Sequence, residues 1–219
     1  MMFRDEGDIL ERCLQHWINC GIDTMYLCDN GSVDNSLAIS KRYYRNVVYD
    51  SRTNWPGREV INKLKAQAIK DGYEWIFPVD ADEFVHLGEF ENINQWISAY
   101  PDKYGWGEVK YLNILPNGKS DWQEPHRKCF GKLKADWIIC MGNHFIENAP
   151  HTLDSKGVYY EHYSLRTFEQ FKQKMINYMT AFHQSPFQTH PHAVDYHNWK
   201  RDGDEFLMSR WNSLINMLG

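Results

Sequence analysis

The sequence predicts an α/β fold in which a mostly parallel central sheet is flanked by helices and followed by a less regular second half. Strand-like and helix-like segments alternate through residues 1–90. Polar clusters follow the first, second and fourth strand-like segments, where ligands bind in sheets of this kind. The composition is 42% hydrophobic and 24% charged, which is typical of a folded chain with a sizeable core.

The first half contains four strand-like and three helix-like segments. The strand-like segments are residues 1–3, 24–28, 47–49 and 75–79. Apolar residues recur at helical spacing in residues 8–19, 34–44 and 59–70. Gly21 can end the first helix, and Asp71 with Gly72 can end the third. Pro78 indicates that the fourth strand bends or lies near an edge of the sheet.

The second half is less regular. Helical patterns occupy residues 92–99, 167–183 and 206–218, and strand patterns occupy residues 107–115, 128–141 and 158–163. The remaining segments, residues 116–125 and 185–198, are rich in turn-forming residues and are predicted to be loops.

Charge and cysteine content exclude several classes of protein. The net charge is −5 and there is no long basic run, which argues against a nucleic-acid partner. We find no secretory segment and no membrane-length apolar run, which predicts a soluble cytoplasmic protein without a membrane span. Five scattered cysteines without a Cys-x-x-Cys pair indicate reduced thiols. The chain can also be one domain of a longer protein.

Asp80-Ala81-Asp82 is the strongest candidate for chemistry. Two carboxylates two residues apart at a strand end can point the same way and share a hard cation. Mn²⁺ and Mg²⁺ prefer oxygen ligands and complete their shells with phosphate oxygens. A solvated acidic turn is the alternative. Because Glu83 follows directly, this run of acids after a buried strand needs a positive charge to offset it, and we expect a bound cation.

The clusters after the first two strands allow two interpretations each. Asp5 or Glu6 can accept hydrogen bonds from a base edge, near a helix N-terminus that favours an anion. Capping of that helix by Asp5 or Asp8 is the alternative. In the second cluster, capping explains Ser32 or Asp34 but does not explain why an acid, Asp29, lies at the strand end.

The order of these clusters resembles that of the family-2-like GT-A glycosyltransferases. The resemblance is carried by RDEGD at residues 4–8, DNGSVD at 29–34, WIFPVDADEF at 75–84 and EHYSLRT at 161–167. It spans about residues 1–179, and the very short first strand departs from it. The chain is similar to bacterial enzymes of surface-polysaccharide assembly and to soluble glycosyltransferases of large DNA viruses, for which the location would be the host cytoplasm.

The resemblance implies a GT-A, Rossmann-like fold over a single domain, residues 1–219. Residues 1–90 would bind the nucleotide sugar, and residues 91–219 would form an irregular acceptor side with closing helices. It further implies a nucleoside-diphosphate sugar, most often UDP-linked as in UDP-glucose, together with Mn²⁺ or Mg²⁺. The acceptor would be a carbohydrate or glycoprotein hydroxyl. The resemblance favours transfer with inversion of the anomeric centre, and retention is the alternative.

The resemblance also assigns roles to individual residues. Asp5 and Glu6 would lie near the uracil, and Asp29 near the base or ribose. Asp80 would lie near the ribose and the cation. Asp82 would be the main metal ligand, and His162 would complete the metal shell. For His162 the alternative is a strand-end histidine bonded to the backbone.

Pyrophosphate binding and general-base catalysis need residues that lie outside these motifs. Arg58, at the start of the third helix, can contact the pyrophosphate as a cationic donor. An inverting enzyme needs a general base beside the acceptor. The candidates in the second half are Asp121, Glu124, His126 and His144, and each can equally be a loop residue that faces water.

Two other functions remain possible. The histidines of the C-terminal loop could form a zinc hydrolase site; they are His183, His190, His192 and His197. Their spacing lacks the His-x-x-x-His geometry of helical metallohydrolase sites, which favours a plain surface loop. The second alternative is a non-catalytic module that binds sugar nucleotides or glycans and lacks a base.

Overall fold

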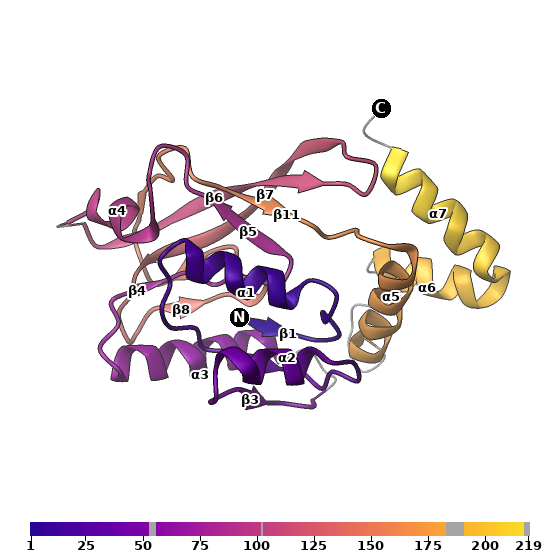
Figure 1. Ribbon diagram of the computed structural model, residues 1–219, viewed down its shortest axis with the longest axis horizontal. Helices are drawn as coiled ribbons and strands as arrows, with labels where there is room; N and C mark the ends of the chain where they lie inside the picture. Colours follow the sequence, from indigo (N-terminus) through magenta and orange to yellow (C-terminus); the bar gives the residue numbers. More distant parts are fainter. Residues whose placement is uncertain (53–55, 102, 183–190, 217–219) are drawn as a thin grey trace. The chain divides into compact units, whose positions relative to one another are not determined.

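The computed structural model in Figure 1 describes residues 1–52, 56–101, 103–182 and 191–216. The side chains of residues 123–126, 141, 180–182 and 191–193 lie outside this description as well. The chain divides into two compact units. Unit 1 comprises Met1–Ser51, Gly57–Leu112 and Trp122–His162, and unit 2 comprises Arg52–Pro56, Asn113–Asp121 and Tyr163–Gly219. Whether residues 1–219 act as one domain stays a prediction.

Unit 1 begins with a parallel sheet of three short strands in the order β1-β2-β3. These strands are β1 (Met2–Phe3), β2 (Cys28–Asp29) and β3 (Val48–Tyr49). The helices that connect and follow them are α1 (Leu10–Asn19), α2 (Ser36–Tyr43) and α3 (Gly57–Lys70). The sheet and its flanking helices confirm the predicted α/β fold with a parallel sheet.

The helices of unit 1 form where apolar residues recur at helical spacing. In α1 the buried positions are Leu10, Cys13, Leu14 and Trp17. This face packs against α2 and against β5 (Glu83–His86). In α3 the apolar residues Val60, Ile61, Leu64 and Ala68 are buried. Each helix therefore covers the strands with the face that the sequence predicts.

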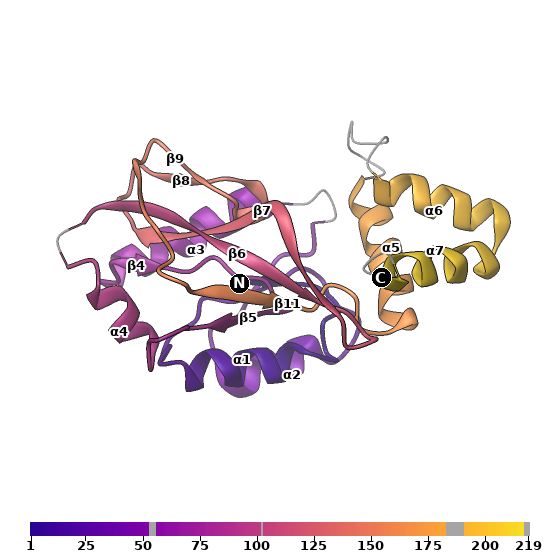
Figure 2. The same ribbon diagram turned by 90° about the horizontal axis from the view of Figure 1, so that it is seen from above.

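A second, mixed sheet forms the other layer of unit 1 and follows the order β4-β7-β6-β11-β5, with β10 paired to β6. Its strands are β4 (Trp75–Ile76), β5, β6 (Gly105–Ile114), β7 (Ser120–Lys132), β10 (His151–Leu153) and β11 (Tyr159–His162). Figure 2 shows the long strands β6 and β7 side by side. Smaller elements complete unit 1: α4 (Ile93–Ser98), β8 (Ile138–Ile139), η1 (Met141–Asn143) and β9 (Ile146–Glu147).

The fourth strand differs from the prediction. We expected residues 75–79 to extend the parallel sheet, but β4 contains only Trp75 and Ile76 and pairs antiparallel with β7. Pro78 cannot donate a backbone hydrogen bond, which is consistent with pairing that stops before it. The predicted loop at residues 116–125 is also too long, because β7 begins at Ser120.

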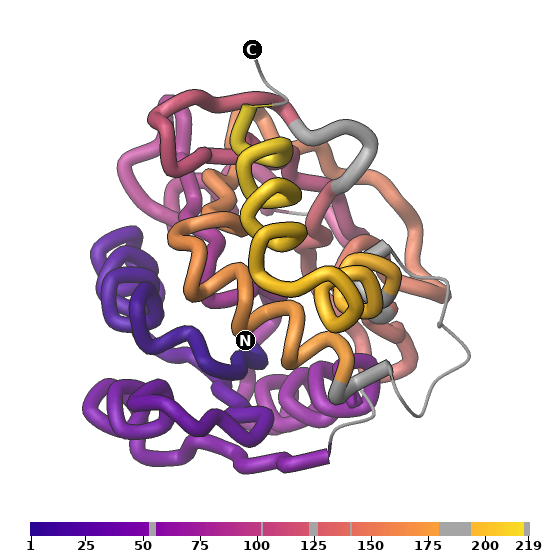
Figure 3. The backbone as a smooth tube through the Cα atoms, turned by 90° about the vertical axis from the view of Figure 1, so that its right-hand side faces the viewer, coloured from indigo at the N-terminus to yellow at the C-terminus, as the bar shows by residue number. Residues whose placement is uncertain are grey.

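Unit 2 is mainly helical. Its helices are α5 (Phe168–Phe182), α6 (Pro191–Asp202) and α7 (Asp204–Asn216), which pack on one another as Figure 3 shows. Their shared core consists of Phe171, Met175, Trp199, Leu207 and Trp211. The predicted loop at residues 185–198 is wrong from Pro191 onward, because α6 occupies that stretch. Pro191 is the first residue of α6, a position at which proline costs a helix no hydrogen bond.

No helix in the part of the chain that the structure describes is both long enough and apolar enough to cross a membrane.

Candidate active site

Asp80, Ala81 and Asp82 form the connection between β4 and β5, and Asp82 lies in the turn that precedes β5. Strand β5 pairs antiparallel with β11, and in this register Glu83 lies opposite His162. The pairing brings the acidic turn and the predicted histidine together, although they are about eighty residues apart in sequence. Helix α1 holds the same turn from the other side, because the Trp17 indole N–H donates to the Glu83 carbonyl at 3.0 Å.

Glu83 is the centre of the hydrogen-bond network behind the turn. Its side chain is 1% exposed. The Tyr111 hydroxyl donates to its Oε1 at 2.7 Å, and the Asp80 backbone N–H donates to its Oε2 at 2.8 Å. Burial raises the pKa of Glu83, against the opposing effect of the Lys128 ammonium. These partners all donate, so the geometry suits the ionised, accepting form of the carboxyl group.

Lys128 supplies a positive charge to this network from β7. Its side chain is 2% exposed, and its Nζ lies 2.5 Å from Asp80 Oδ2 and 3.3 Å from Glu83 Oε1. Burial lowers the pKa of Lys128, but the carboxylates of Asp80 and Glu83 overcome this effect and hold the pKa above its usual value. The ammonium therefore provides part of the compensating charge that the run of acids requires.

Asp82 and His162 are the residues best placed to hold a metal ion. One ligand atom from each of Asp82, Glu83 and His162 lies within 4.8 Å of the others. The distance from His162 Nε2 to Asp82 Oδ1 is 3.9 Å, and the Asp82 side chain is 7% exposed. The His162 ring stacks on the Tyr111 ring, with centroids 4.9 Å apart. A carboxylate and an imidazole suit Mn²⁺, so the residues present fit the predicted cation.

Within that group, Glu83 accepts hydrogen bonds from the Tyr111 hydroxyl and the Asp80 backbone N–H and lies against the Lys128 ammonium. To bind an ion it would have to give up contacts with Tyr111, Lys128 or the Asp80 backbone. Glu83 thus supports the turn from behind, and the role of Asp82 and His162 as metal ligands stays a prediction. The Asp80 carboxylate, which the resemblance places near the ribose and the cation, lies against Lys128.

Asp29 lies at the end of β2 and is fully buried. Its Oδ1 accepts backbone hydrogen bonds from Gly31 and Ser32, both at 2.8 Å. Its Oδ2 is buried, and no described residue forms a hydrogen bond with it. A buried carboxylate oxygen that lacks a donor carries a desolvation cost, which a ligand N–H or O–H could remove.

The loop after β1 is tied to the loop after β2. The Asp5 N–H donates to Ser32 Oγ at 3.0 Å, and Asp5 Oδ1 accepts from the Val33 N–H at 2.7 Å. The Glu6 N–H donates to Ser36 Oγ at 2.9 Å. The Glu6 carbonyl accepts from the backbone of Ile9 and Leu10 and so starts the first helical turn. Asp5 thus binds the neighbouring loop, which neither sequence interpretation included.

Arg58 lies in the first turn of α3, as predicted, and its side chain is half exposed. Its guanidinium lies 2.6 Å from Glu147 Oε2. Contact between Arg58 and a pyrophosphate stays a prediction, and it would compete with this ion pair.

The structure describes the side chains of two of the four candidate bases. Asp121 lies on β7 within unit 2 and is exposed. The side chains of Glu124 and His126 lie outside the described residues. His144 Nδ1 forms a hydrogen bond with the Arg127 carbonyl. Nearby, the Trp122 ring is 47% exposed and meets the Tyr159 ring edge-on. The assignment of the base therefore stays a prediction.

The histidines of the zinc alternative are only partly described. His183 and His190 lie outside the described residues, as does the side chain of His192. His197 is exposed on α6, where its ring meets that of Tyr196 edge-on. Among the described residues, the group around Asp82 is the one set of three candidate ligands close enough to share an ion.

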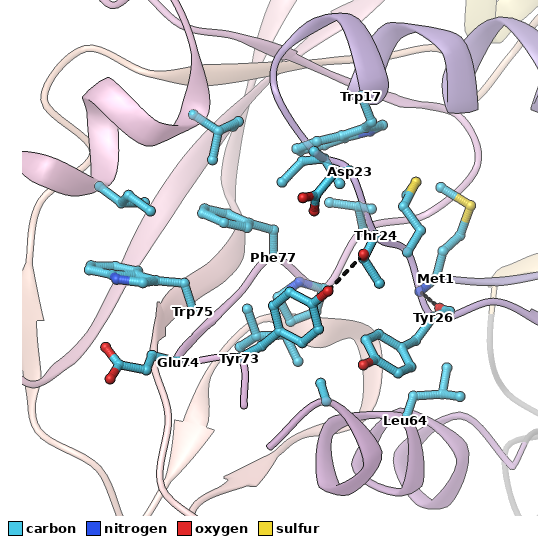
Figure 4. Close-up of a pocket in the computed structure, with 18 of the residues that line it drawn as sticks. Met1, Trp17, Asp23, Thr24, Tyr26, Leu64, Tyr73, Glu74, Trp75 and Phe77 are labelled. Carbon is cyan, nitrogen blue, oxygen red and sulfur yellow. Dashed lines mark hydrogen bonds between the residues drawn. The ribbon is translucent and has the colours of Figure 1, made fainter. Parts of the chain in front are cut away.

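A separate cavity of about 350 Å³ opens in unit 1, and Figure 4 shows its lining. Its walls include the rings of Trp17, Tyr26, Tyr73, Trp75 and Phe77. The Tyr73 hydroxyl donates to Thr24 Oγ1 at 2.8 Å, and the Met1 amino group donates to the Tyr26 carbonyl at 2.9 Å. None of Asp80, Asp82, Glu83 or His162 lines it. The lining includes two carboxylates, Asp23 and Glu74, but neither belongs to the group of candidate metal ligands around Asp82.

Sequence reasoning missed three residues of the network. Glu83 was treated as part of an acidic run, and Tyr111 and Lys128 were not considered. One feature of the sequence could have identified Lys128: it directly precedes Cys129 and Phe130 in a segment predicted to be a strand. A lysine in such a run is rarely buried without a charged partner. Nothing in the sequence identifies that partner, because it depends on the pairing of distant strands.

Comparisons with known proteins found weak structural likenesses. No protein-family model matches the chain, and no curated protein matches it. A crystal structure of S. aureus TarS 1-349 gives a TM-score of 0.48 at 13% identity, covering 90% of this chain and 70% of that chain. TarS 1-349 in complex with UDP gives 0.49 at 14% identity, covering 97% and 72%. TarS gives 0.43 at 12% identity, covering 90% and 42%.

TM-scores in this range do not establish a shared fold, and identities this low do not establish a shared function. The chain's own architecture is a mixed α/β fold with a parallel sheet, flanking helices and an acidic turn before β5.

Proposed function

We propose that this protein is a metal-dependent glycosyltransferase that moves a hexose from a nucleoside-diphosphate sugar to a carbohydrate or protein-linked hydroxyl. The donor class is UDP-sugars, such as UDP-glucose, and the cation is Mn²⁺ or Mg²⁺. The observation that carries the proposal is the meeting of Asp82 and His162 at the start of the β5–β11 ladder, backed by the buried Glu83 network.

Different residues would bind the cation and the nucleoside of the donor. Asp82 and His162 would hold the cation, which when bound neutralises charge on the departing diphosphate. The buried Oδ2 of Asp29 is an unsatisfied acceptor that suits an N–H of a base or a ribose hydroxyl. The loop containing Asp5 and Glu6 is fixed to the β2 loop by hydrogen bonds, which supports its predicted place beside the base.

The transfer step of this proposal is a single displacement. The acceptor oxygen attacks the anomeric carbon while the bond from that carbon to the diphosphate oxygen breaks, which inverts the centre. The hydroxyl proton passes to a base among Asp121, Glu124, His126 and His144.

A panel of UDP- and GDP-sugars with Mn²⁺ tests the donor claim. We expect one or more UDP-sugars to raise the melting temperature and to release UDP slowly by hydrolysis, and we expect EDTA to abolish both effects. In Asp82→Asn the carboxylate charge is lost at constant size, so metal-dependent binding should fall by about tenfold or more.

Glu59→Gln is the matched control, because Glu59 is an exposed acid on α3 that pairs with Lys63. It should behave as the unmodified protein does. The absence of any response to every nucleotide sugar would refute the proposal. Binding without hydrolysis or transfer, across a range of glycan acceptors, would favour the non-catalytic module instead.

A further inference from the structure

Lys128 brings a buried positive charge to the carboxylates of Asp80 and Glu83. Lys128 Nζ lies 2.5 Å from Asp80 Oδ2 and 3.3 Å from Glu83 Oε1, and its side chain is 2% exposed. A buried ammonium is costly unless it is paired and hydrogen bonded. Two carboxylates satisfy that need, and they stand at the two ends of the Asp80–Glu83 segment.

The pairing fixes the shape of the turn that carries Asp82. Lys128 holds Asp80 from one side, and Glu83 accepts the Asp80 backbone N–H at 2.8 Å. Tyr111 donates to Glu83 at 2.7 Å, and the same tyrosine ring stacks on His162. A change at Lys128 therefore acts on both Asp82 and His162 through residues that touch them.

Lys128 also sets the charge that a metal ion meets. Its ammonium lies against the side chains of Asp80 and Glu83, the two residues that flank Ala81 and Asp82 in the turn. A cation bound by Asp82 and His162 would be repelled by a buried ammonium so near, because screening is weak at a buried site.

We propose that Lys128 is a positioning residue and an internal counter-cation, which orients the Asp80–Glu83 turn and keeps the affinity for a free divalent ion low until a diphosphate supplies further negative charge. This inference rests on the proposed function for its biological meaning. The affinity of the protein for a free divalent ion can be measured without a nucleotide.

The test is a titration of Mn²⁺ alone, followed by electron paramagnetic resonance of the free ion, in the full chain and in Lys128→Met. Removing the ammonium should tighten Mn²⁺ binding by about tenfold or more, because one buried repulsive charge is gone. A purely structural role predicts the opposite sign, since a disordered turn would bind Mn²⁺ more weakly.

Two further variants make the outcome decisive. Lys128→Gln keeps a hydrogen-bond donor for Asp80 and Glu83 while it removes the charge, so it should fold even if Lys128→Met does not, and should also tighten Mn²⁺ binding. Lys132→Met is the matched control on the same strand. Lys132 contacts the Pro101 carbonyl and the rings of Trp75 and Tyr104, so its loss should leave Mn²⁺ affinity unchanged.

Unchanged or weaker Mn²⁺ binding in a folded Lys128→Gln protein would overturn the inference. That result is separable from failure of the proposed function. If the unmodified protein binds UDP with Mn²⁺ but Lys128→Gln does not bind Mn²⁺ more tightly, the proposed function is supported and the role of Lys128 is contradicted. If the unmodified protein binds no nucleotide but Lys128→Gln binds Mn²⁺ more tightly, the role of Lys128 is supported and the proposed function is contradicted.

Discussion

Asp29 shows how a single buried oxygen can indicate a ligand. One of its carboxylate oxygens accepts two backbone N–H groups, whereas the other is buried with no hydrogen-bond partner among the described residues. An unsatisfied buried acceptor costs about 1–3 kcal/mol, and a ligand that donates to this oxygen would remove that cost. Proteins commonly retain a side chain that lowers the stability of the fold when ligand binding requires that side chain.

Substitution Asp29→Asn tests this interpretation. The amide can keep Oδ1 as the acceptor for Gly31 and Ser32, so the nucleotide-free protein should be as stable as before or slightly more stable. Affinity for UDP should fall by about tenfold, because a charge-assisted hydrogen bond becomes a neutral one or is lost. Urea unfolding and calorimetric titration with UDP measure the two effects.

Asp154→Asn provides the comparison, since Asp154 accepts the Lys156 N–H in a distant loop. It should leave UDP affinity unchanged. An unchanged UDP affinity in Asp29→Asn would remove Asp29 from the binding site.

At the scale of elements, helices were predicted better than strands. The helix patterns of residues 8–19 and 59–70 match α1 and α3 to within two residues at each end. A helix forms through contacts four residues apart, so its pattern is local. Strands such as β8, β9 and β10 consist of only two or three residues. Such strands form by pairing with other strands, and a single sequence does not show which strands pair.

The close packing of β7 illustrates such a distant constraint. A side chain added at Gly131 would place its Cβ 2.4 Å from the Gly105 carbonyl oxygen and 2.9 Å from the Trp106 Cα. Both contacts are with backbone atoms, which cannot move aside without disturbing the sheet. Gly131 also pairs with Ile76 of β4, next to the segment that leads into Asp80.

Gly131→Ala should therefore lower the free energy of unfolding by about 2 kcal/mol or more, through strain at a site that cannot expand. Gly118→Ala should cost only about 1 kcal/mol, because its φ of 79° is strained for alanine but no atom lies within 4 Å of the new Cβ. Urea unfolding of both variants measures the difference. Equal losses would show that the sheet around Gly131 is looser than described.

At the scale of the whole molecule, the α/β fold class with a parallel sheet could be predicted from the sequence, and the hydrogen-bond network around Glu83 could not. Polar clusters after the predicted strands led us to expect a ligand there, because parallel strands place their carboxyl ends together, and the site itself stays a prediction. The positions of Lys128 and Tyr111 depend on how β6 and β7 enter the second sheet. The helices of unit 2 form their own apolar core, and α6 was missed because its apolar pattern is weak.

The central claim is that Asp82 and His162 hold a divalent cation that binds a nucleotide diphosphate. A crystal structure of the protein with UDP and Mn²⁺, with anomalous data collected at the manganese edge, tests it most directly. We predict one manganese peak bonded to an Asp82 oxygen, to a nitrogen of His162 and to phosphate oxygens of UDP, with the base near Asp29. Manganese at the C-terminal histidines, or UDP inside the aromatic cavity, would contradict the account.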